Sequence, residues 1–299
     1  MTDAAPHFIS LLAGTVILRP YVFIFLFVYL AASTLQFGLR RTLMFTLAGY
    51  ALVFVAEYSS TRIGIPFGFY YYLDSTRQQE LWISNVPFMD SLSFVFLAYA
   101  SYTTALLLSA PLWRVQGDIQ VIDSKAIRRS PSVLILSVML FVLIDIIIDP
   151  LALRGSHWFL GQIYGYYEEG LYFGVPLANF LGWGIVGAGL ITLHRLIDGV
   201  FRQQPQKRAD WGVRWVPLRG LMGPVLYLGV YAFNVFMTFY IKAYLLGLVD
   251  LFLIMPVLTL AIILICRPAN RATQADLAAH LQDFPHSPLA FLRDRQTLS

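Results

Sequence analysis

The chain has 299 residues, of which 58% are hydrophobic and only 13% charged, and its mean hydropathy is +0.66. A typical soluble protein has about 25% charged residues, so this composition excludes a soluble enzyme and indicates an integral membrane protein. The net charge of +4 comes from 21 Lys and Arg against 17 Asp and Glu. Because the basic residues gather between apolar stretches, no nucleic-acid partner is expected.

Seven apolar stretches approach the length that a helix needs to cross a bilayer. In chain order they cover residues 21–37, 42–57, 91–112, 132–149, 175–197, 221–240 and 245–266. A further apolar stretch, 8–18, precedes the first and is separated from it by Arg19-Pro20, so six or eight spans are alternatives. The sequence predicts an all-α, polytopic transmembrane helix bundle of about seven spans in a single domain, residues 1–267.

The basic residues alternate between the two sides of this bundle. Sixteen Lys and Arg fall in the connections 38–41, 113–131 and 195–220 and after residue 266, and only five fall on the other side. The positive-inside rule then predicts an inner-membrane protein with its N-terminus outside and its C-terminus in the cytoplasm. Residues 268–299 are expected to form a short polar cytoplasmic tail, with an amphipathic turn near Asp276–Leu281.

The two long connections on the non-cytoplasmic side resemble each other. Both are rich in Gly, Pro and aromatic residues, as in Gly64–Tyr72 and Tyr164–Tyr167. Each follows a span that is predicted to end in an acid, Glu57 in the first case and Asp149 in the second. The sequence therefore predicts a degenerate repeat of two span–loop–span units, residues 42–112 and 132–197.

Two carboxyl groups lie in the most apolar part of the chain, at Asp145 and Asp149. At helical spacing they project from one face, about 6 Å apart along the helix axis. A charge at the centre of a bilayer costs at least about 2.5 kcal/mol, so acids in such a position usually have a function.

Three more acids, Glu57, Asp90 and Asp250, are predicted near the outer ends of other spans. Together with Asp149 they are expected to converge on one cavity in the outer half of the bundle. Two simpler interpretations stay open: Asp90 suits the start of a helix, and Asp250 has Lys242 nearby as an ion-pair partner.

The familiar motifs of nucleotide, hydrolase and metal sites are absent: the sequence has no glycine-rich phosphate loop, no GxSxG and no HExxH or CxxC. Its five histidines are scattered, and the lone cysteine, Cys266, excludes an intramolecular disulfide. We therefore expect neither a metal nor a cofactor. Proton chemistry by carboxyl groups and the transport of an ion or solute are the remaining functions.

Several motifs taken together resemble one family of membrane proteins. The second unit carries Ile144-Asp145, three apolar residues, Asp149-Pro150, Trp158 and the run Gly174–Trp183. The first unit carries Glu57, Gly64–Tyr72 and Val86-Pro87. Over roughly residues 45–200 the chain resembles the carotenoid biosynthesis family of membrane hydratases, the CruF-like group. The stretch Met89–Phe94 departs from that family in being more polar.

This resemblance implies a carotenoid 1,2-hydratase, a hydro-lyase that adds water to the terminal 1,2 double bond of an acyclic carotenoid such as lycopene. Haloarchaeal relatives act on bisanhydrobacterioruberin, the precursor of bacterioruberin. The expected partners are the acyclic carotenoid, water and the lipid bilayer, with other carotenoid enzymes in a complex.

Carboxyl groups in an apolar site suit this reaction. Protonation of an alkene carbon needs a strong, positioned acid, and a buried carboxyl group tends to keep its proton. Asp149 is the expected general acid, with Asp145 and Glu57 in support. Aromatic rings and polar groups that face the resulting cation and water are the expected substrate-binding residues: Tyr70, Tyr72, Asp90, Trp158, Asn179 and Trp183.

Three other hypotheses are compatible with the sequence. The first, from another functional class, is a proton-coupled transporter or flippase of a lipid-like solute, because acids within spans are typical of such proteins. The second is a non-catalytic scaffold for a complex of carotenoid enzymes. The third is that hydration is coupled to a different modification of the carotenoid end.

Overall fold

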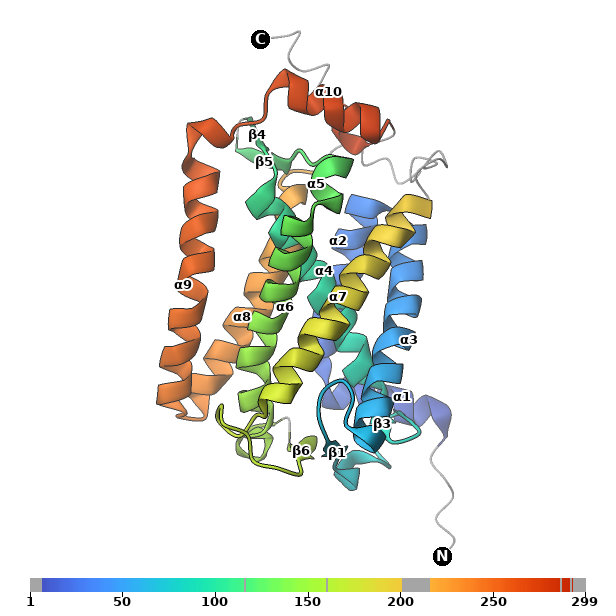
Figure 1. Ribbon diagram of the computed structural model, residues 1–299. Helices are drawn as coiled ribbons and strands as arrows, with labels where there is room; N and C mark the ends of the chain where they lie inside the picture. Colours follow the sequence, from blue (N-terminus) through green and yellow to red (C-terminus); the bar gives the residue numbers. More distant parts are fainter. Residues whose placement is uncertain are drawn as a thin grey trace, which may run out of the picture.

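A computed structural model describes residues 7–115, 117–159, 161–200, 216–285, 287–290 and 292 of the chain. Within these residues seven helices are long and apolar enough to cross a membrane, and they stand side by side as one bundle (Figure 1). They are α2 (Pro20–Phe37), α3 (Leu39–Ile63), α4 (Phe88–Ser109), α6 (Pro131–Ala152), α7 (Leu177–Val200), α8 (Met222–Tyr240) and α9 (Tyr244–Cys266). The prediction of an all-α polytopic bundle is confirmed.

Helix α4 is the centre of the bundle and the most deeply buried of the seven. It packs against α2, α3, α6, α7 and α8. Small side chains such as Ala98, Ala100, Ser101 and Ala105 are fully buried along it. Such residues let helix backbones approach closely, which is the usual way in which helices associate in a membrane.

Helix α9 stands at the edge of the bundle and packs mainly on α8 (Figure 1). Its buried residues are Leu246, Gly247, Asp250 and Ile254 only. Phe252, by contrast, is 75% exposed. An exposed apolar face of this kind is expected where a helix faces lipid.

The second span is longer than predicted, which corrects the position of Glu57. Helix α3 runs to Ile63, where Gly64 ends it in the left-handed conformation with φ 75°. Its last residues are polar, yet Ser60 is fully buried and its hydroxyl accepts a hydrogen bond from the Phe67 backbone at 2.9 Å. Glu57 therefore lies inside the span, more than a turn before its end.

The two similar connections pair with each other at one end of the bundle. Strand β1 (Tyr70–Tyr72) and strand β6 (Tyr164–Tyr166) form an antiparallel pair in which Tyr70 faces Tyr166 and Tyr72 faces Tyr164. This places two segments almost a hundred residues apart side by side (Figure 1). A second small pair, β2 (Trp82–Ile83) and β3 (Val86–Pro87), leads into α4.

The apolar stretch before the first span forms its own helix, α1 (Phe8–Leu18), at the same end as β1 and β6 (Figure 1). Its eleven residues are too few to cross a bilayer. Helix α2 begins directly after Arg19, with Pro20 at its first position. Arg19 is buried in an ion pair with Glu80 at 3.0 Å, which ties this junction to the loop before α4.

The opposite end of the bundle carries a second, smaller core. The elements at this end include strands β4 (Leu112–Val115) and β5 (Asp118–Val121) and helices α5 (Lys125–Arg129) and α10 (Gln274–Asp283). Trp113 and Ile122 pack here against Leu277 of α10. The described part of the predicted polar tail is thus folded against the bundle, and its helix is longer than the single turn expected.

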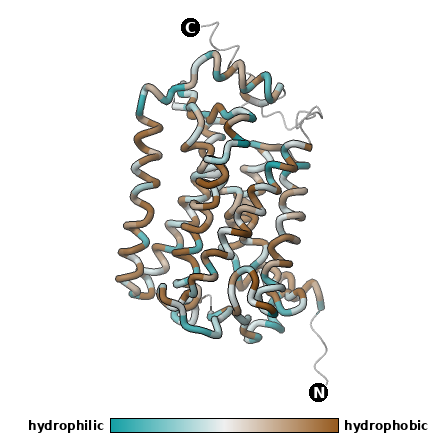
Figure 2. Tube along the Cα trace, viewed as in Figure 1, coloured by the Kyte–Doolittle hydropathy of each residue, from teal (hydrophilic) through white to brown (hydrophobic). Residues whose placement is uncertain are grey.

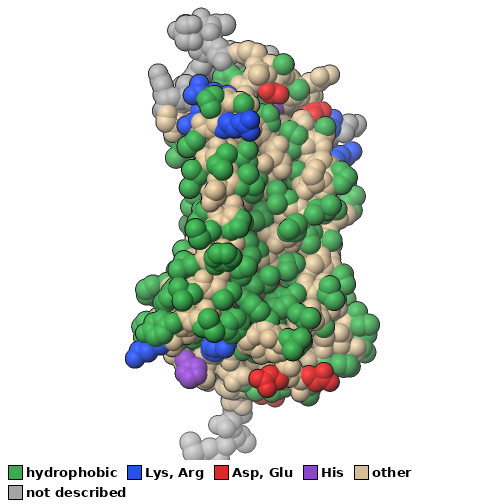
Figure 3. Space-filling model, turned by 60° about the vertical axis from the view of Figure 1, so that its left-hand side comes forward, with side chains coloured by type: hydrophobic (Ala, Val, Ile, Leu, Met, Phe, Trp, Pro, Cys, Tyr) green, Lys and Arg blue, Asp and Glu red, His purple; other side chains and the backbone are tan. Residues whose placement is uncertain are grey.

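Hydropathy and charge are distributed as a membrane requires. Apolar residues follow the length of the helices (Figure 2). On the face in Figure 3 a broad apolar belt separates two charged ends. Seven apolar helices and this belt make the chain a multi-pass membrane protein.

Candidate functional site

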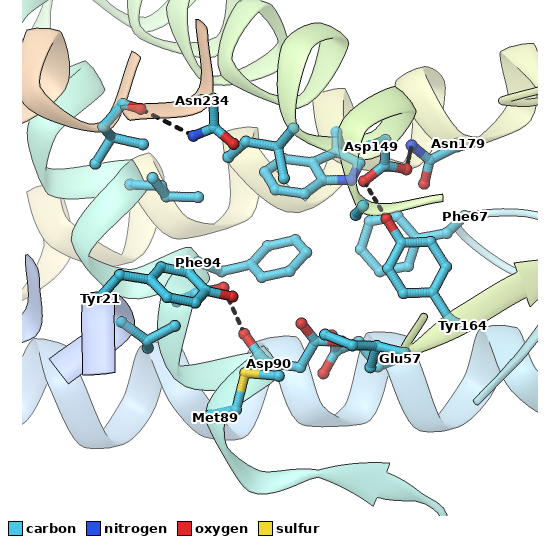
Figure 4. A pocket seen from close by; sticks show the side chains of 18 of the residues that line it. Tyr21, Glu57, Phe67, Met89, Asp90, Phe94, Asp149, Tyr164, Asn179 and Asn234 are labelled. Atoms are coloured by element: carbon cyan, nitrogen blue, oxygen red, sulfur yellow. Dashed lines mark hydrogen bonds between the residues drawn. The ribbon is translucent and has the colours of Figure 1, made fainter. Parts of the chain in front are cut away.

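The bundle contains a partly open cavity of about 120 Å³, which tyrosines of both β1 and β6 help to line (Figure 4). Its walls come from α2, α3, α4, α6, α7 and α8 and from both tyrosine strands. At about 30 Å³ for each molecule in the liquid, this volume corresponds to roughly four water molecules, which is on the scale of the branched end of a hydrocarbon chain.

Asp149 is held in this cavity by three hydrogen-bond donors. Its Oδ1 accepts from the Tyr164 hydroxyl at 2.8 Å, and its Oδ2 accepts from the Tyr166 hydroxyl at 2.6 Å. The side-chain amide of Asn179 also donates to Oδ2, at 2.7 Å. Strand β6 supplies both phenols because alternate residues of a strand point the same way. The carboxyl group is therefore fixed in one orientation.

Asp145 lies directly behind Asp149 and is fully buried. Asn179 donates a second hydrogen bond to it, at 2.9 Å, and so bridges the two carboxyl groups. The Oδ1 of Asp145 has no hydrogen-bond partner within the described residues. An ionised carboxylate is an acceptor only and is costly to bury without donors, so Asp145 is the member of the pair that suits holding a proton.

The phenols around Asp149 stay protonated and act as donors. Burial raises the pKa of Tyr164 and Tyr166 well above 10, and the carboxyl group of Asp149 raises both further. Neither phenol ionises at neutral pH.

A second pair of carboxyl groups, Glu57 and Asp90, shares one phenol. The Tyr72 hydroxyl lies 3.1 Å from Glu57 Oε1 and 2.5 Å from Asp90 Oδ2. The Ser91 hydroxyl donates to Glu57 Oε2. Because a phenol has a single proton, Tyr72 satisfies one carboxyl group at a time, and the other contact needs a proton on the carboxyl group itself. These contacts are therefore best satisfied when the pair holds one proton.

Large aromatic rings form the wall behind the carboxyl groups. Trp183 of α7 stacks on Phe94 of α4 with ring centroids 4.1 Å apart. The ring centroid of Phe141 of α6 lies 4.8 Å from that of Trp183. All three rings are at least 95% buried. Aromatic faces of this kind stabilise a positive charge without water.

The structure brings most of the predicted site residues together. The cavity is lined by Glu57, Tyr70, Tyr72, Asp90, Asn179, Asp149, Trp158 and Trp183. Asp145 is outside the lining and reaches the cavity only through Asn179 and Asp149.

The expectation for Asp250 was wrong in one respect. It does not line this cavity, although it is fully buried in α9. Nor does an ion pair join it to Lys242 within the described residues. The physical reason is that Asp250 faces α8, where Tyr231 donates a hydrogen bond to its backbone carbonyl at 2.5 Å.

Some residues of the site were not predicted. Tyr164 and Tyr166 were assigned to an interfacial loop, and Ser91, Tyr21 and Asn234 to no site at all. The spacing of Tyr164 and Tyr166 was a usable signal, because alternate residues of a strand lie on the same face. Nothing in the sequence indicated which face.

The fold and the cavity together define a multi-pass membrane protein with a carboxyl-lined, largely apolar cavity within the bundle. Comparison with known families is consistent with this class. The model of the carotenoid biosynthesis protein family matches residues 11–261, and the chain therefore belongs to that family and has a role in carotenoid synthesis. Searches of curated proteins and of solved structures gave no match.

Proposed function

We propose that the protein is a carotenoid hydratase that adds water to the terminal 1,2 double bond of an acyclic carotenoid. The observation that carries the proposal is the pairing of carboxyl groups on two sides of one apolar cavity, Asp149 with Asp145 and Glu57 with Asp90. Hydration needs one group to give a proton and another to take one back, and this arrangement supplies both.

Asp149 is the general acid of the proposed reaction. Its proton passes to C2 of the alkene, the π electrons form the new C–H bond, and a tertiary cation remains at C1. Tyr164, Tyr166 and Asn179 stabilise the carboxylate that is left behind, which makes Asp149 a stronger acid when it is most needed. Asp145 holds the second proton of the pair.

Water then captures the cation. Its oxygen forms the C–O bond at C1 and loses a proton to the Glu57–Asp90 pair, which lies on the other side of the cavity from Asp149 (Figure 4). The proton then returns from the Glu57–Asp90 pair to Asp149 through water in the cavity, so that the sum over one turnover is alkene plus water giving a tertiary alcohol, with no oxidant or reductant. Trp183 and the tyrosines face the cation, and the apolar lining of the cavity limits its loss to side reactions.

The test is expression of the chain in a bacterium that makes lycopene, followed by mass analysis of the pigments. A hydratase gives a product heavier by one water for each end that reacts. A transporter or flippase, the alternative function, moves a pigment without changing its mass. Unchanged lycopene beside well-folded protein would contradict the proposal for this substrate, and other acyclic carotenoids are then tested in the same way.

A further inference from the structure

The cavity has two ends of different character. At its polar end Asp149 and Asn179 are at least 95% buried, beneath Tyr164 and Tyr166 of β6, which are themselves partly buried. At its other end, Tyr21 of α2 and Asn234 of α8 lie across the cavity from them (Figure 4). A carotenoid is a long rod, so an end placed among the carboxyl groups leaves the rest of the molecule to be accommodated at this second end.

Four aromatic side chains mark the boundary between this second end and the surface. Tyr21, Phe25, Trp158 and Phe233 all line the cavity, and all four are only partly buried. The lining residues deeper in the same region, such as Val230, are almost fully buried. We call these four side chains the aromatic gate.

The rings of the gate pack on one another and bridge α2 and α8. Tyr21 stacks on Phe233 with ring centroids 5.2 Å apart, and Phe25 meets Phe233 edge-on at 5.9 Å. Trp158 lies 6.3 Å from Phe233 and 6.4 Å from Tyr21. Among the described residues no hydrogen bond between side chains joins the four rings, so they meet through aromatic contacts, which rearrange by simple side-chain rotation.

The surface beside the gate faces lipid. Ile24 and Phe27 of α2 are 61% and 73% exposed, and Phe236 of α8 is 65% exposed. All three lie within the apolar membrane-spanning helices. A ligand that passes the gate therefore comes from the bilayer.

We propose that the aromatic gate is the lateral entrance through which a linear polyene chain passes from the bilayer into the cavity. With one end among the carboxyl groups, the chain runs between the gate rings and continues into lipid between α2 and α8. Flat conjugated chains stack well on aromatic faces, which suits this passage to a polyene. The identity of the ligand rests on the proposed function, whereas the location of the entrance does not.

A cross-link across the gate tests the proposal. Phe25→Cys and Phe233→Cys are combined with Cys266→Ser and Asp149→Asn, so that the pigment binds without turnover, and a short bifunctional thiol reagent joins the pair. The protein in liposomes is mixed with liposomes that carry lycopene, then re-isolated, and its bound pigment is measured by absorbance. Cross-linking before mixing should slow pigment uptake on the order of tenfold or more, and cross-linking after loading should trap the pigment.

The matched control places the same cross-link between α8 and α9. Phe239 and Tyr244 have ring centroids 6.4 Å apart, against 5.9 Å for Phe25 and Phe233, and neither lines the cavity. Phe239→Cys with Tyr244→Cys should leave uptake unchanged. Equal uptake by gate-linked and unlinked protein, with the link confirmed by mass, would overturn the proposal.

Single substitutions give a second test that needs no cross-link. Phe233→Ala removes the ring that contacts the other three and should speed pigment entry, whereas Phe236→Ala, three residues further on the lipid-exposed face, should not. The same effect from both variants, or no effect from either, contradicts a gate at Phe233.

Failure of the gate and failure of the proposed function give different results. If wild-type protein binds lycopene through the gate but yields no hydrated product, the entrance stands and the hydratase assignment falls. If hydration proceeds but the gate cross-link changes neither uptake nor trapping, the hydratase assignment stands and the proposed entrance falls. Protein that takes up no lycopene contradicts both.

Discussion

Asp149 is the residue on which the proposed chemistry depends. Asn in its place keeps the size of the side chain but has no acidic proton. Its side-chain NH₂ group would also face donors in a position where an oxygen of Asp149 accepts hydrogen bonds. We expect Asp149→Asn to lower hydration by at least about 100-fold, the usual contribution of a general acid. The measurement is pigment conversion per mole of protein in membranes.

Asp250→Asn is the control for this substitution. Asp250 is also a buried aspartate in a membrane-spanning helix, but it lies outside the cavity. Its variant should retain hydration. If both variants lose activity equally, the effect reflects assembly of the bundle and not proton transfer.

Tyr166 is expected to position Asp149 through its short hydrogen bond of 2.6 Å. Tyr166→Phe keeps the ring and removes only the donor. A hydrogen bond to a charged group contributes about 1.5–3 kcal/mol, so the rate should fall roughly 10- to 100-fold. The next residue, Tyr167, is 67% exposed, and Tyr167→Phe should have no effect on the same assay. A matching loss in both variants would exclude this positioning role.

At the scale of elements, the fit of α7 against the first connection depends on Gly182. A β-carbon at this position would lie 2.7 Å from both the Phe67 Cα and the Pro66 carbonyl oxygen, so backbone has to move. We expect Gly182→Ala to destabilise the protein by about 1–3 kcal/mol, as overpacking does. The measurement is thermal unfolding in detergent.

Gly184 lies on the same helix and serves as the control. A β-carbon there meets nothing closer than a Val142 methyl group at 3.9 Å. Gly184→Ala should leave the unfolding temperature unchanged. Equal destabilisation by the two variants would show that the contact with Phe67 is not the cause.

The end of the bundle that carries α10 is expected to respond to acid. Burial alone would raise the pKa of Asp123, but the Arg128 guanidinium at 2.6 Å and hydrogen bonding with His280 outweigh it and hold that pKa well below its usual range. A lowered pKa stabilises the fold above the ordinary aspartate pKa of about 3.9, and this stability is lost as the pH falls further.

Hydrogen exchange of α10 measures this dependence. Protection should stay constant from neutral pH to about 4 and weaken below that value. Asp123→Asn should reduce protection at neutral pH and remove much of the acid dependence. Loss of protection near pH 6 in the parent chain would contradict the assignment to Asp123.

At the scale of the whole molecule, the distribution of basic residues predicts the orientation in the membrane. Cysteines introduced in a Cys266→Ser chain report it: Ser156→Cys lies near β6 and Ala278→Cys lies on α10, both at exposed positions. An impermeant maleimide added to spheroplasts should label residue 156 at once and residue 278 only after permeabilisation. The opposite pattern would reverse the topology.

The spans could be predicted from the sequence because apolar runs of sufficient length have few other uses. The end of α3 could not be predicted, because Thr61 and Arg62 are typical of a loop. In the structure their side chains donate hydrogen bonds to the Tyr58 carbonyl of their own helix. Of the four acids expected in one cavity, Glu57, Asp90 and Asp149 line it and Asp250 does not. The geometry of the cavity depends on the pairing of β1 with β6, which no local pattern specifies.

The most direct test of the proposed hydration is made with purified protein, lycopene and water enriched in heavy oxygen. The oxygen of a hydration product comes from water, whereas an oxygenase takes it from molecular oxygen and a transporter adds none. We predict a pigment that gains one water with heavy oxygen for each reacted end, and no such product with Asp149→Asn. Unlabelled oxygen in the product, or full labelling by Asp149→Asn, would contradict acid-catalysed hydration in this cavity.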